Sequence, residues 1–580
     1  MLAPKYYLYL ASDGDRRLRV SLSSNPRVDA QLLRKAGFGS LQIIKPPFPI
    51  YLAELALERL SARGSQLNPA SFYRMAAKVL QSLGFRQRLT LERFAPAELC
   101  PPEPLQFPEL TGLLSGRILL GTELPELIAA QGLALPWDLE DWMQYLYFHA
   151  SIRREAAVTV DRLGMPFCRR CGATAGIVED DCFFCGNAHC HTCTQCRSMG
   201  IAKSCSPLYS QPLVTDSAPE GRIRPQLNFE LTPPQQRASS ALEAFLDGPG
   251  RHFLVWAVCG GGKTEVSFAA VAKVLSAGGR VLFAVPRKDI VQELEPRFQD
   301  AFPGQALVAL YGGSGGKYED PALVLATTHQ CLRFYQAFDL VILDEADAFP
   351  YFGSEMLRLA VERALKPSGK LMMMTATPDP ALLDSVHKGE IPLVTIPARP
   401  HRRPLIVPRF VRTSLGPVGR GAWQPPDFLR ELLRNVHADH RRLLIFLPTV
   451  REVETARPAL CGWAKSLGLT GKYLHAGTPD RQQFKAALSI GAADFLVVTT
   501  VFERGITIPD LDVVVLNADA EGVFDCRTLV QIAGRAGRRG EPAQVIFAGR
   551  RENRAMRAAV DWITEMNRAG YDQGYLDELN

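Results

Sequence analysis

Several features of exported and membrane proteins are missing from this sequence of 580 residues. Its first residues show no basic start followed by an apolar core and a small-residue cleavage site, which argues against a secretory signal. No apolar run reaches the roughly 18 residues that a membrane-spanning helix needs. We therefore expect a cytoplasmic protein with no transmembrane segment of its own.

The sequence also has little excess charge, no internal repeat and no low-complexity tract. Its 66 Lys and Arg residues exceed its 60 Asp and Glu residues by only six, so charge permits a nucleic-acid partner without indicating one. An apolar fraction of 47% excludes a disordered chain, and 580 residues are too many for a single core. We expect a folded protein of about three to five domains.

Apolar, strand-like runs alternate with helical stretches from about residue 230 onward, which indicates βαβ units and buried parallel sheets. Proline and arginine interrupt the series at 397–404, so we expect two α/β domains in tandem. The expected strands lie within 253–258, 280–286, 323–328, 340–347, 371–378, 441–448, 494–500, 512–518 and 544–549.

The remaining boundaries follow from proline breaks and motif positions. The region before the first cysteine pair carries no recognisable motif, and its fold is unknown at this point. The expected division is an N-terminal region at 1–160, a cysteine-rich module at 161–210, a connector at 211–229, a first α/β domain at 230–397, a linker at 398–404 and a second α/β domain at 405–580.

The segment 257–264 reads AVCGGGKT between a strand-like run and a helical one, the context of a phosphate-binding P-loop. Its glycines let backbone N–H groups surround phosphates, the lysine reaches the outer phosphates, and the threonine hydroxyl can bind Mg²⁺. The predicted ATP-binding residues are Ala257, which stands where glycine is usual, Gly260, Gly261, Gly262, Lys263 and Thr264.

The segment LVILDEAD supplies the carboxylates that a P-loop requires. Asp344 is the predicted ligand of the Mg²⁺ ion, and Glu345 is predicted to polarise the attacking water. Asp347 completes the tetrad. Lys263, Asp344 and Glu345 are therefore predicted catalytic residues.

Further motifs appear in order over 231–540, and together they resemble the superfamily 2 helicases of the DEAD-box-like type. LTPPQ at 231–235 is similar to the adenine-recognising motif, with Gln235 as the reader. Thr375-Ala376-Thr377 is similar to the tripeptide that couples the two domains, and 499–507, which includes Gly505, resembles the motif that touches both nucleotide and nucleic acid. QIAGRAGR at 531–538 is similar to the last motif, with Gln531 at the nucleotide and Arg535 and Arg538 as arginine fingers. The resemblance implies two RecA-like domains with ATP between them.

Eight of the thirteen cysteines lie between 168 and 205, which in a reducing compartment indicates metal binding rather than disulfides. Two CxxC pairs, Cys168/Cys171 and Cys182/Cys185, supply the four thiolates of a structural Zn²⁺ site. Whether Cys190, Cys193, Cys196 and Cys205 hold a second ion stays open at this stage.

A cysteine-rich module directly before a helicase engine resembles the late-competence DNA-uptake ATPase of Gram-positive bacteria, the ComFA type. The matching segments include CRRCG, CFFCG, CHTCTQCRSMG, SCSPLY, AVPRKDIVQELEPRF and PARPHRRP. The resemblance implies an ATP-dependent, single-stranded-DNA translocase that drives uptake of transforming DNA, beside the uptake channel and its cytoplasmic companion proteins at the inner face of the membrane. The implied cofactors are ATP, Mg²⁺ and Zn²⁺.

Three alternatives remain at this stage. A primosomal restart helicase of the PriA type also combines zinc with this engine, but there the cysteines interrupt the helicase portion. A DEAD-box RNA-remodelling ATPase would explain the tetrad, although its last motif usually begins with histidine rather than Gln531. A binding module without hydrolysis would be expected to lack some of the catalytic residues, which are all present.

Such helicases hold the phosphodiester backbone with little base preference. The candidate contact segments are the loop after Pro286-Arg287, the Gly312-Gly313 turn, Thr327-Thr328-His329 and Thr499-Thr500.

Overall fold

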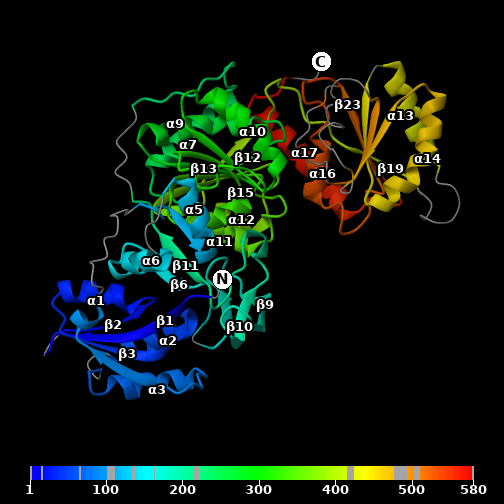
Figure 1. The fold of residues 1–580 in the computed structure, drawn as a ribbon. Helices are drawn as coiled ribbons and strands as arrows, with labels where there is room; N and C mark the ends of the chain where they lie inside the picture. Colours follow the sequence, from blue (N-terminus) through cyan, green and yellow to red (C-terminus); the bar gives the residue numbers. More distant parts are fainter. Residues whose placement is uncertain are drawn as a thin grey trace.

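The computed structural model shows an N-terminal unit, a small sheet that flanks a cysteine-rich module, and two RecA-like domains (Figure 1). The residues it describes are 3–14, 17–63, 67–100, 112–133, 138–161, 163–214, 221–413, 424–439, 441–475, 478, 493–500, 508 and 510–577. Among these residues, no helix is both long enough and apolar enough to cross a membrane.

The N-terminal unit is a four-stranded antiparallel sheet, in the order β2-β1-β3-β4, covered by helices. Strand β1 is central and almost entirely buried, since the sheet packs against α2 and α3 on one face and α1 on the other. Its elements are β1 (Lys5–Ser12), β2 (Leu18–Ser23), α1 (Pro26–Lys35), β3 (Ser40–Pro49), α2 (Ile50–Ser61), α3 (Phe72–Ser82), β4 (Thr90–Phe94) and α4 (Pro96–Leu99).

A small second sheet joins segments from either side of the cysteine cluster. Strand β11 pairs antiparallel with both β5 and β6, so it connects residues of the predicted N-terminal region to the end of the predicted cysteine-rich module, across residue 160. The elements are β5 (Arg117–Leu120), η2 (Gly121–Glu123), α5 (Leu124–Ala130), α6 (Leu139–Phe148), β6 (Arg153–Ala156) and β11 (Pro207–Gln211).

The cysteine-rich module lies between β6 and β11 and consists of two short hairpins, β7-β8 and β9-β10, followed by a 3₁₀ turn. Short strands with little apolar surface cannot form a core of their own, so this module depends on its cysteines and its neighbours. The elements are β7 (Val158–Val160), β8 (Pro166–Cys168), β9 (Ile177–Cys182), β10 (Asn187–Cys193) and η3 (Arg197–Met199).

The first RecA-like domain contains a seven-stranded parallel sheet in the order β14-β15-β13-β16-β17-β12-β18. The five central strands are apolar because helices or other units cover both faces. The elements are α7 (Pro233–Asp247), β12 (His252–Ala257), α8 (Lys263–Val266), α9 (Phe268–Ser276), β13 (Val281–Val285), α10 (Lys288–Ala301), β14 (Leu307–Leu310), β15 (Leu323–Thr327), η4 (Thr328–Arg333), β16 (Phe338–Asp344), α11 (Glu355–Ala364), β17 (Leu365–Thr375), α12 (Pro380–His387) and β18 (Leu393–Ile396).

The second RecA-like domain has a six-stranded parallel sheet in the order β19-β24-β23-β20-β22-β21. Its elements are β19 (Arg409–Arg412), α13 (Asp427–Ala438), β20 (Arg442–Phe446), α14 (Val450–Ser466), β21 (Gly471–Leu474), β22 (Phe495–Val498), β23 (Leu511–Leu516), α16 (Cys526–Ala533), β24 (Val545–Gly549) and α17 (Arg554–Asp572). The predicted α/β class with two RecA-like domains is confirmed. Figure 1 shows that the cysteine-rich module and the second domain contact different sides of the first domain.

Candidate nucleotide site and metal clusters

The P-loop connects the carboxyl end of β12 to α8, as the sequence predicts. Gly260 and Gly262 both have φ of +80°, a left-handed conformation that a side chain disfavours. A Cβ atom on Gly262 would also collide with the amide of Gln235. These glycines are therefore required by the path of the loop, and Lys263 follows as the first residue of the helix.

Gln235 lies directly behind the P-loop and is almost fully buried. Its Nε2 donates to the Gly261 carbonyl at 3.0 Å, and its Oε1 accepts hydrogen bonds from the backbone N–H and the hydroxyl of Thr232, each at 2.9 Å. The side chain thus joins the start of α7 to the P-loop. Its predicted contact with adenine stays a prediction.

The acidic motif lies at the carboxyl end of β16, at the same edge of the parallel sheet as the P-loop. Lys263 Nζ lies 3.7 Å from Asp344 Oδ1 and 3.6 Å from Glu345 Oε1. Glu345 has φ of +57°, which is uncommon for a residue with a side chain and turns the chain sharply after the strand. The arrangement brings the basic and acidic catalytic candidates into one cluster.

Asp347 connects this turn to the end of β17. Its two carboxylate oxygens accept hydrogen bonds from the hydroxyls of Thr375 at 2.6 Å and Thr377 at 2.7 Å. The predicted coupling tripeptide is therefore held against the DEAD segment, and its role in coupling the two domains stays a prediction.

The second RecA-like domain completes the site from the opposite side. A cavity of about 510 Å³ lies between the two domains, within the size range of small-molecule sites. Among the residues that line it are Gln235, Gly260, Gly261, Gly262, Lys263, Thr264, Asp344, Glu345, Gln531, Arg535 and Arg538. The structure thus brings together the candidates from both domains; Ala257 lies just behind, buried at the end of β12, and Gly505 lies outside the described residues.

Gln531 and Arg538 are oriented toward the P-loop side of this cavity. Gln531 Oε1 accepts a hydrogen bond from Cys259 Sγ at 3.1 Å, while its Nε2 is buried without a hydrogen-bond partner among the described residues. Burial lowers the pKa of Arg538, whose Nε donates to the Gly534 carbonyl at 3.2 Å. A buried amide donor and buried guanidinium groups in one cavity suit a polyanionic ligand.

Arg399 is a site residue that the sequence analysis does not single out, because its segment PARPHRRP indicates a linker and a ComFA-like segment but gives no residue in it a role. It is 2% exposed and donates to the Cys259 carbonyl at 2.9 Å and to the carbonyls of Gly534, Ala536 and Gly537 at 2.7–2.8 Å. Burial lowers its pKa to about 10, and neighbouring Arg538 acts in the same direction. Arg399 therefore joins the P-loop to the arginine-finger loop. The signal available in the sequence was an arginine flanked by prolines between two domains.

The candidate nucleic-acid segments lie at turns and strand ends of the two domains. Arg287 Nη2 lies 3.0 Å from Asp289 Oδ2, and Lys288 lies over the Tyr311 ring. Thr328 and His329 begin η4, and Thr499 directly follows β22. The side chains of Thr327, Thr328 and Thr499 are buried. Their contact with nucleic acid stays a prediction.

The structure corrects the predicted metal-ligand set. Cys168 and Cys171 do not lie with Cys182 and Cys185; each pair joins a different pair of later cysteines. Hairpin β9-β10 folds back between them, so the pairs interleave instead of closing in sequence order. The two groups, each with its sulfur atoms within 4.8 Å of one another, are cluster 1 (Cys168, Cys171, Cys193 and Cys196) and cluster 2 (Cys182, Cys185, Cys190 and Cys205).

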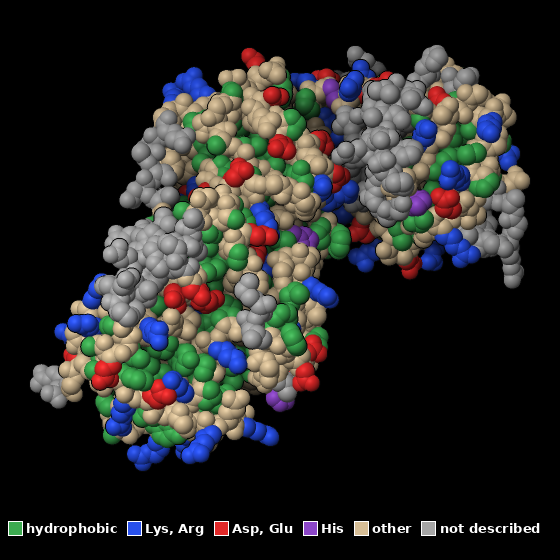
Figure 2. Space-filling model, viewed as in Figure 1, with side chains coloured by type: hydrophobic (Ala, Val, Ile, Leu, Met, Phe, Trp, Pro, Cys, Tyr) green, Lys and Arg blue, Asp and Glu red, His purple; other side chains and the backbone are tan. Residues whose placement is uncertain are grey.

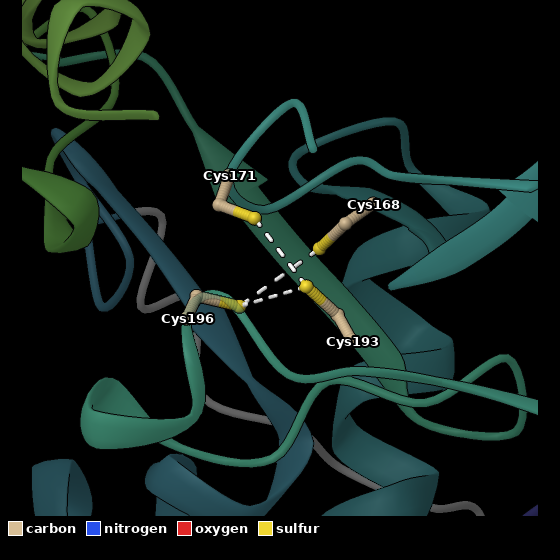
Figure 3. Close-up of side chains that lie close together, drawn as sticks. All are labelled: Cys168, Cys171, Cys193 and Cys196. Carbon is tan, nitrogen blue, oxygen red and sulfur yellow. Dashed lines mark hydrogen bonds between the residues drawn. The ribbon is translucent and has the colours of Figure 1, made fainter. Parts of the chain in front are cut away.

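The geometry of both clusters fits a tetrahedral metal ion. In cluster 1, the four sulfur atoms point toward one centre (Figure 3), with Sγ···Sγ distances of 3.9 Å for Cys168–Cys196, 3.6 Å for Cys171–Cys193 and 3.8 Å for Cys193–Cys196. In cluster 2, Cys182 and Cys205 are 3.8 Å apart. Four thiolates about 2.3 Å from a Zn²⁺ ion would be separated by about 3.8 Å. Each cluster could therefore hold one metal ion.

The two clusters differ in what surrounds them. The sulfur atoms of cluster 1 belong to the same apolar core as Phe338 and Val361 of the first RecA-like domain. Cluster 2 packs instead against Ala3, near Tyr51 of the N-terminal unit. Cluster 1 is thus part of the motor's core, and cluster 2 belongs to the junction with the N-terminal unit.

Comparisons with known proteins agree with this architecture. The family model described as the competence protein ComFA N-terminal domain matches residues 105–210. Those described as the type III restriction enzyme res subunit and the helicase conserved C-terminal domain match 228–380 and 424–540.

Two relatives share most of their length with this chain. The competence protein ComFA of Bacillus subtilis (strain 168) is 37% identical over 385 residues, which cover 65% of this chain and 80% of that protein. The chain belongs to the ComFA family. A second ComFA, from Streptococcus pneumoniae (strain ATCC BAA-255 / R6), is 34% identical over 411 residues, 70% of this chain and 91% of that protein.

Membership of the ComFA family confirms the resemblance stated from the sequence. The helicase domains make this ComFA-family chain a nucleic-acid-dependent ATPase of the helicase type, which uses ATP with Mg²⁺. The three matched models leave residues 1–104 uncovered.

Proposed function

We propose that this ComFA-family protein is an ATP-dependent single-stranded-DNA translocase that drives the uptake of transforming DNA during natural competence. The observation that carries the proposal is the shared cavity, in which the P-loop and carboxylates of one domain face Arg535 and Arg538 of the other. Hydrolysis at a site divided between two domains couples closure of the cleft to movement along a strand.

The residues around the cavity have distinct proposed roles. Lys263 places positive charge on the outer phosphates, and Thr264 and Asp344 would hold the Mg²⁺ ion, which neutralises phosphate charge when bound. Glu345 orients the attacking water, and Arg535 and Arg538 stabilise the charge that develops on the transferred phosphoryl group. Gln235 and Gln531 contact the nucleotide, with Gly505 of the second domain as a further predicted contact.

Each cysteine cluster is proposed to hold one structural Zn²⁺ ion. Four thiolates complete a tetrahedral shell and leave no position for a reacting water, so the ions would support the fold rather than the chemistry. Removal of the Zn²⁺ ions should therefore affect ATP turnover only by disturbing the fold.

The name shared by the two relatives supports a role in competence. We propose that the protein works in the cytoplasm at the inner face of the membrane, where it would meet the uptake channel and its companion proteins. Single-stranded DNA is the proposed track.

The test is steady-state ATP hydrolysis by the purified chain without nucleic acid and with single-stranded DNA, duplex DNA, forked DNA or RNA. Strong stimulation by plain single-stranded DNA is expected. Stimulation mainly by forks would favour a replication-restart helicase, and stimulation mainly by RNA would favour an RNA-remodelling ATPase. No hydrolysis under any condition would contradict a motor function altogether.

A further inference from the structure

The N-terminal unit and the cysteine-rich module form a continuous groove away from the ATP site. One cavity of about 640 Å³ lies between the two units, and a second of about 520 Å³ lies beside α3 and β4. Both are lined by Arg86 and Gln87, so the two cavities meet at that turn. We call this combined depression the N-terminal groove.

The charged side chains at the turn that joins the two cavities are basic. The lining includes Lys5, Arg86 and Arg88, and none of the described residues that line it is an aspartate or a glutamate. His189 and His191 also line it, but both lie beside Glu179, so the basic character comes from Lys5 and the two arginines. Arg86 and Arg88 are exposed and form no ion pair with the described residues. A concave surface with uncompensated positive charge attracts polyanions.

The surface beside the groove extends this charge. Between residues 57 and 90 the sequence contains six basic residues and a single acidic one, Glu58. Arg74 and Lys78 follow the groove residues Tyr73 and Ala77 along α3 and are exposed next to them. In Figure 2 several Lys and Arg side chains gather along the edge of the N-terminal unit where Figure 1 labels α3.

Aromatic side chains lie at intervals along the same groove. Tyr73 is 36% exposed, and its hydroxyl donates to the Leu89 carbonyl at 2.9 Å, which fixes the position of the ring. Phe85 packs edge-on against Phe48, and the Tyr51 hydroxyl accepts a hydrogen bond from Asn187 of the module. Fixed aromatic rings in a basic groove are the combination that holds single-stranded nucleic acid without base preference.

We propose that the N-terminal groove is a second binding site for single-stranded DNA, separate from the strand contacts of the two RecA-like domains. Arg86 and Arg88 contact phosphates, and Tyr73 offers a ring on which a base stacks. The identity of the strand as DNA rests on the proposed function. An anionic membrane is a poorer fit, because headgroups pack against a convex or flat surface, whereas these side chains line a hollow between two units.

The test uses the full chain and a double variant, Arg86→Gln with Arg88→Gln. Binding of a labelled oligo-dT of about 30 nucleotides is followed by fluorescence anisotropy, without ATP, over a range of salt concentrations. Two lost phosphate contacts should lower the affinity about tenfold and reduce the slope of log affinity against log salt by roughly 1.4. Unchanged affinity, or an affinity loss with an unchanged slope, would overturn the inference.

The matched control is Arg34→Gln with Lys35→Gln. These two residues are exposed on α1 of the same unit and lie outside the groove lining. Their substitution removes the same net charge as the substitution of Arg86 and Arg88. The control should bind oligo-dT like the unchanged protein. An equal loss in the control would show a general charge effect and would overturn the assignment to the groove.

A second variant tests stacking. Tyr73→Leu keeps an apolar side chain but removes the ring, so oligo-dT affinity should fall about tenfold while the salt slope stays the same. No loss would overturn the stacking contact of Tyr73.

Two further measurements separate this inference from its alternatives. The first is co-sedimentation with phosphatidylserine vesicles. If the unchanged protein sediments with the vesicles, the groove variant does not, and both bind oligo-dT equally, the groove binds membranes instead of DNA. If single-stranded DNA stimulates ATPase in both the unchanged protein and the groove variant and their DNA binding is equal, the groove inference fails and the proposed function stands. If the unchanged protein binds oligo-dT through the groove but DNA never stimulates hydrolysis, the proposed function fails.

Discussion

The first RecA-like domain makes two interfaces of very different character. Against the cysteine-rich module it shares one apolar core that includes all four sulfur atoms of cluster 1. One buried carboxylate pairs with two arginines there: Glu123 accepts from Arg170 at 2.8 Å and from Arg333 at 2.6 Å. Arg363 adds hydrogen bonds to the carbonyls of Arg169 and Arg170.

Against the second RecA-like domain, the first domain has a smaller apolar contact through Val258 and a cavity of about 510 Å³. Arg399 crosses this interface, and its hydrogen-bond partners are carbonyl oxygens instead of carboxylates. A large apolar interface resists opening, whereas an interface around an open cavity is strengthened when a ligand binds to both of its sides. From this difference we expect the interface with the module to stay fixed and the interface with the second RecA-like domain to open and close.

The largest expected effect is at the moving interface. Lys263→Ala should lower ATP turnover on the order of a thousandfold, because the charge on the transferred phosphoryl group loses a fixed partner. Thermal unfolding and metal content, measured on the same samples, should be unchanged, since the fixed interface is not affected. Retained turnover would contradict the assignment of Lys263.

The two metal clusters provide the next comparison. Cys171→Ser in cluster 1 and Cys185→Ser in cluster 2 should each remove about one zinc ion per chain, measured by elemental analysis. Because cluster 1 is inside the motor's core, Cys171→Ser should also destabilise the first RecA-like domain by several kcal/mol and reduce ATP turnover.

Cys185→Ser should leave DNA-free ATP turnover close to normal, because cluster 2 contacts the N-terminal unit. If both variants affected turnover equally, the distinction between a motor cluster and a junction cluster would be wrong.

Glu123→Gln tests the buried ion pairs of the interface with the module. Two arginines would then share a neutral amide in a largely buried position, so the free energy of unfolding should fall by about 3 kcal/mol, as measured by chemical denaturation. Glu126→Gln is the control, because the Glu126 side chain is 60% exposed in its ion pair with Lys317. This substitution should lower the free energy of unfolding by at most about 1 kcal/mol. If both substitutions lowered the free energy of unfolding equally, burial of Glu123 would not explain the effect of Glu123→Gln.

The smallest expected effect concerns Arg399. A lysine at this position has one nitrogen and fails to reach carbonyls on both loops at once, so Arg399→Lys should lower ATP turnover about tenfold, a loss of about 1.4 kcal/mol. Arg402→Lys changes an exposed arginine of the same linker, 48% exposed beside Asp577, and should leave turnover unchanged. A normal rate of ATP turnover in Arg399→Lys would contradict a role for Arg399 in coupling the two loops.

The strands that the sequence predicts and those that it misses differ in position within the sheets. All nine predicted strands are present, from β12 to β24. In the described part of the two parallel sheets the sequence misses four strands, β14, β18, β19 and β21, which are the outermost ones. It also predicts none of the strands β1 to β11 that precede these sheets. An outermost strand has a neighbour on one side only and is covered less completely, so β19 (RFVR) and β21 (GKYL) lack the apolar run that marks a central strand. The apolar strands β14 (LVAL) and β18 (LVTI) have only four residues each.

The candidate site divides in a similar way. Short motifs identify the P-loop, the acidic turn and the arginine fingers, because each works through residues at fixed local spacing. The ligand sets of the clusters and the role of Arg399 depend on segments that meet only after folding. Spacing between CxxC pairs is equally compatible with consecutive and interleaved pairing, and the route of β9-β10 selects the second.

The amino-acid sequence by itself therefore determined the class of the protein, its central strands and the candidate residues of its ATP site, because local patterns of apolar residues and motifs specify these features. Only the tertiary structure decided which cysteines share a cluster, which unit shares an apolar core with the first RecA-like domain, and that a basic groove lies between the N-terminal unit and the module. Each of these depends on distant segments of the chain coming into contact, and local patterns carry no record of that contact.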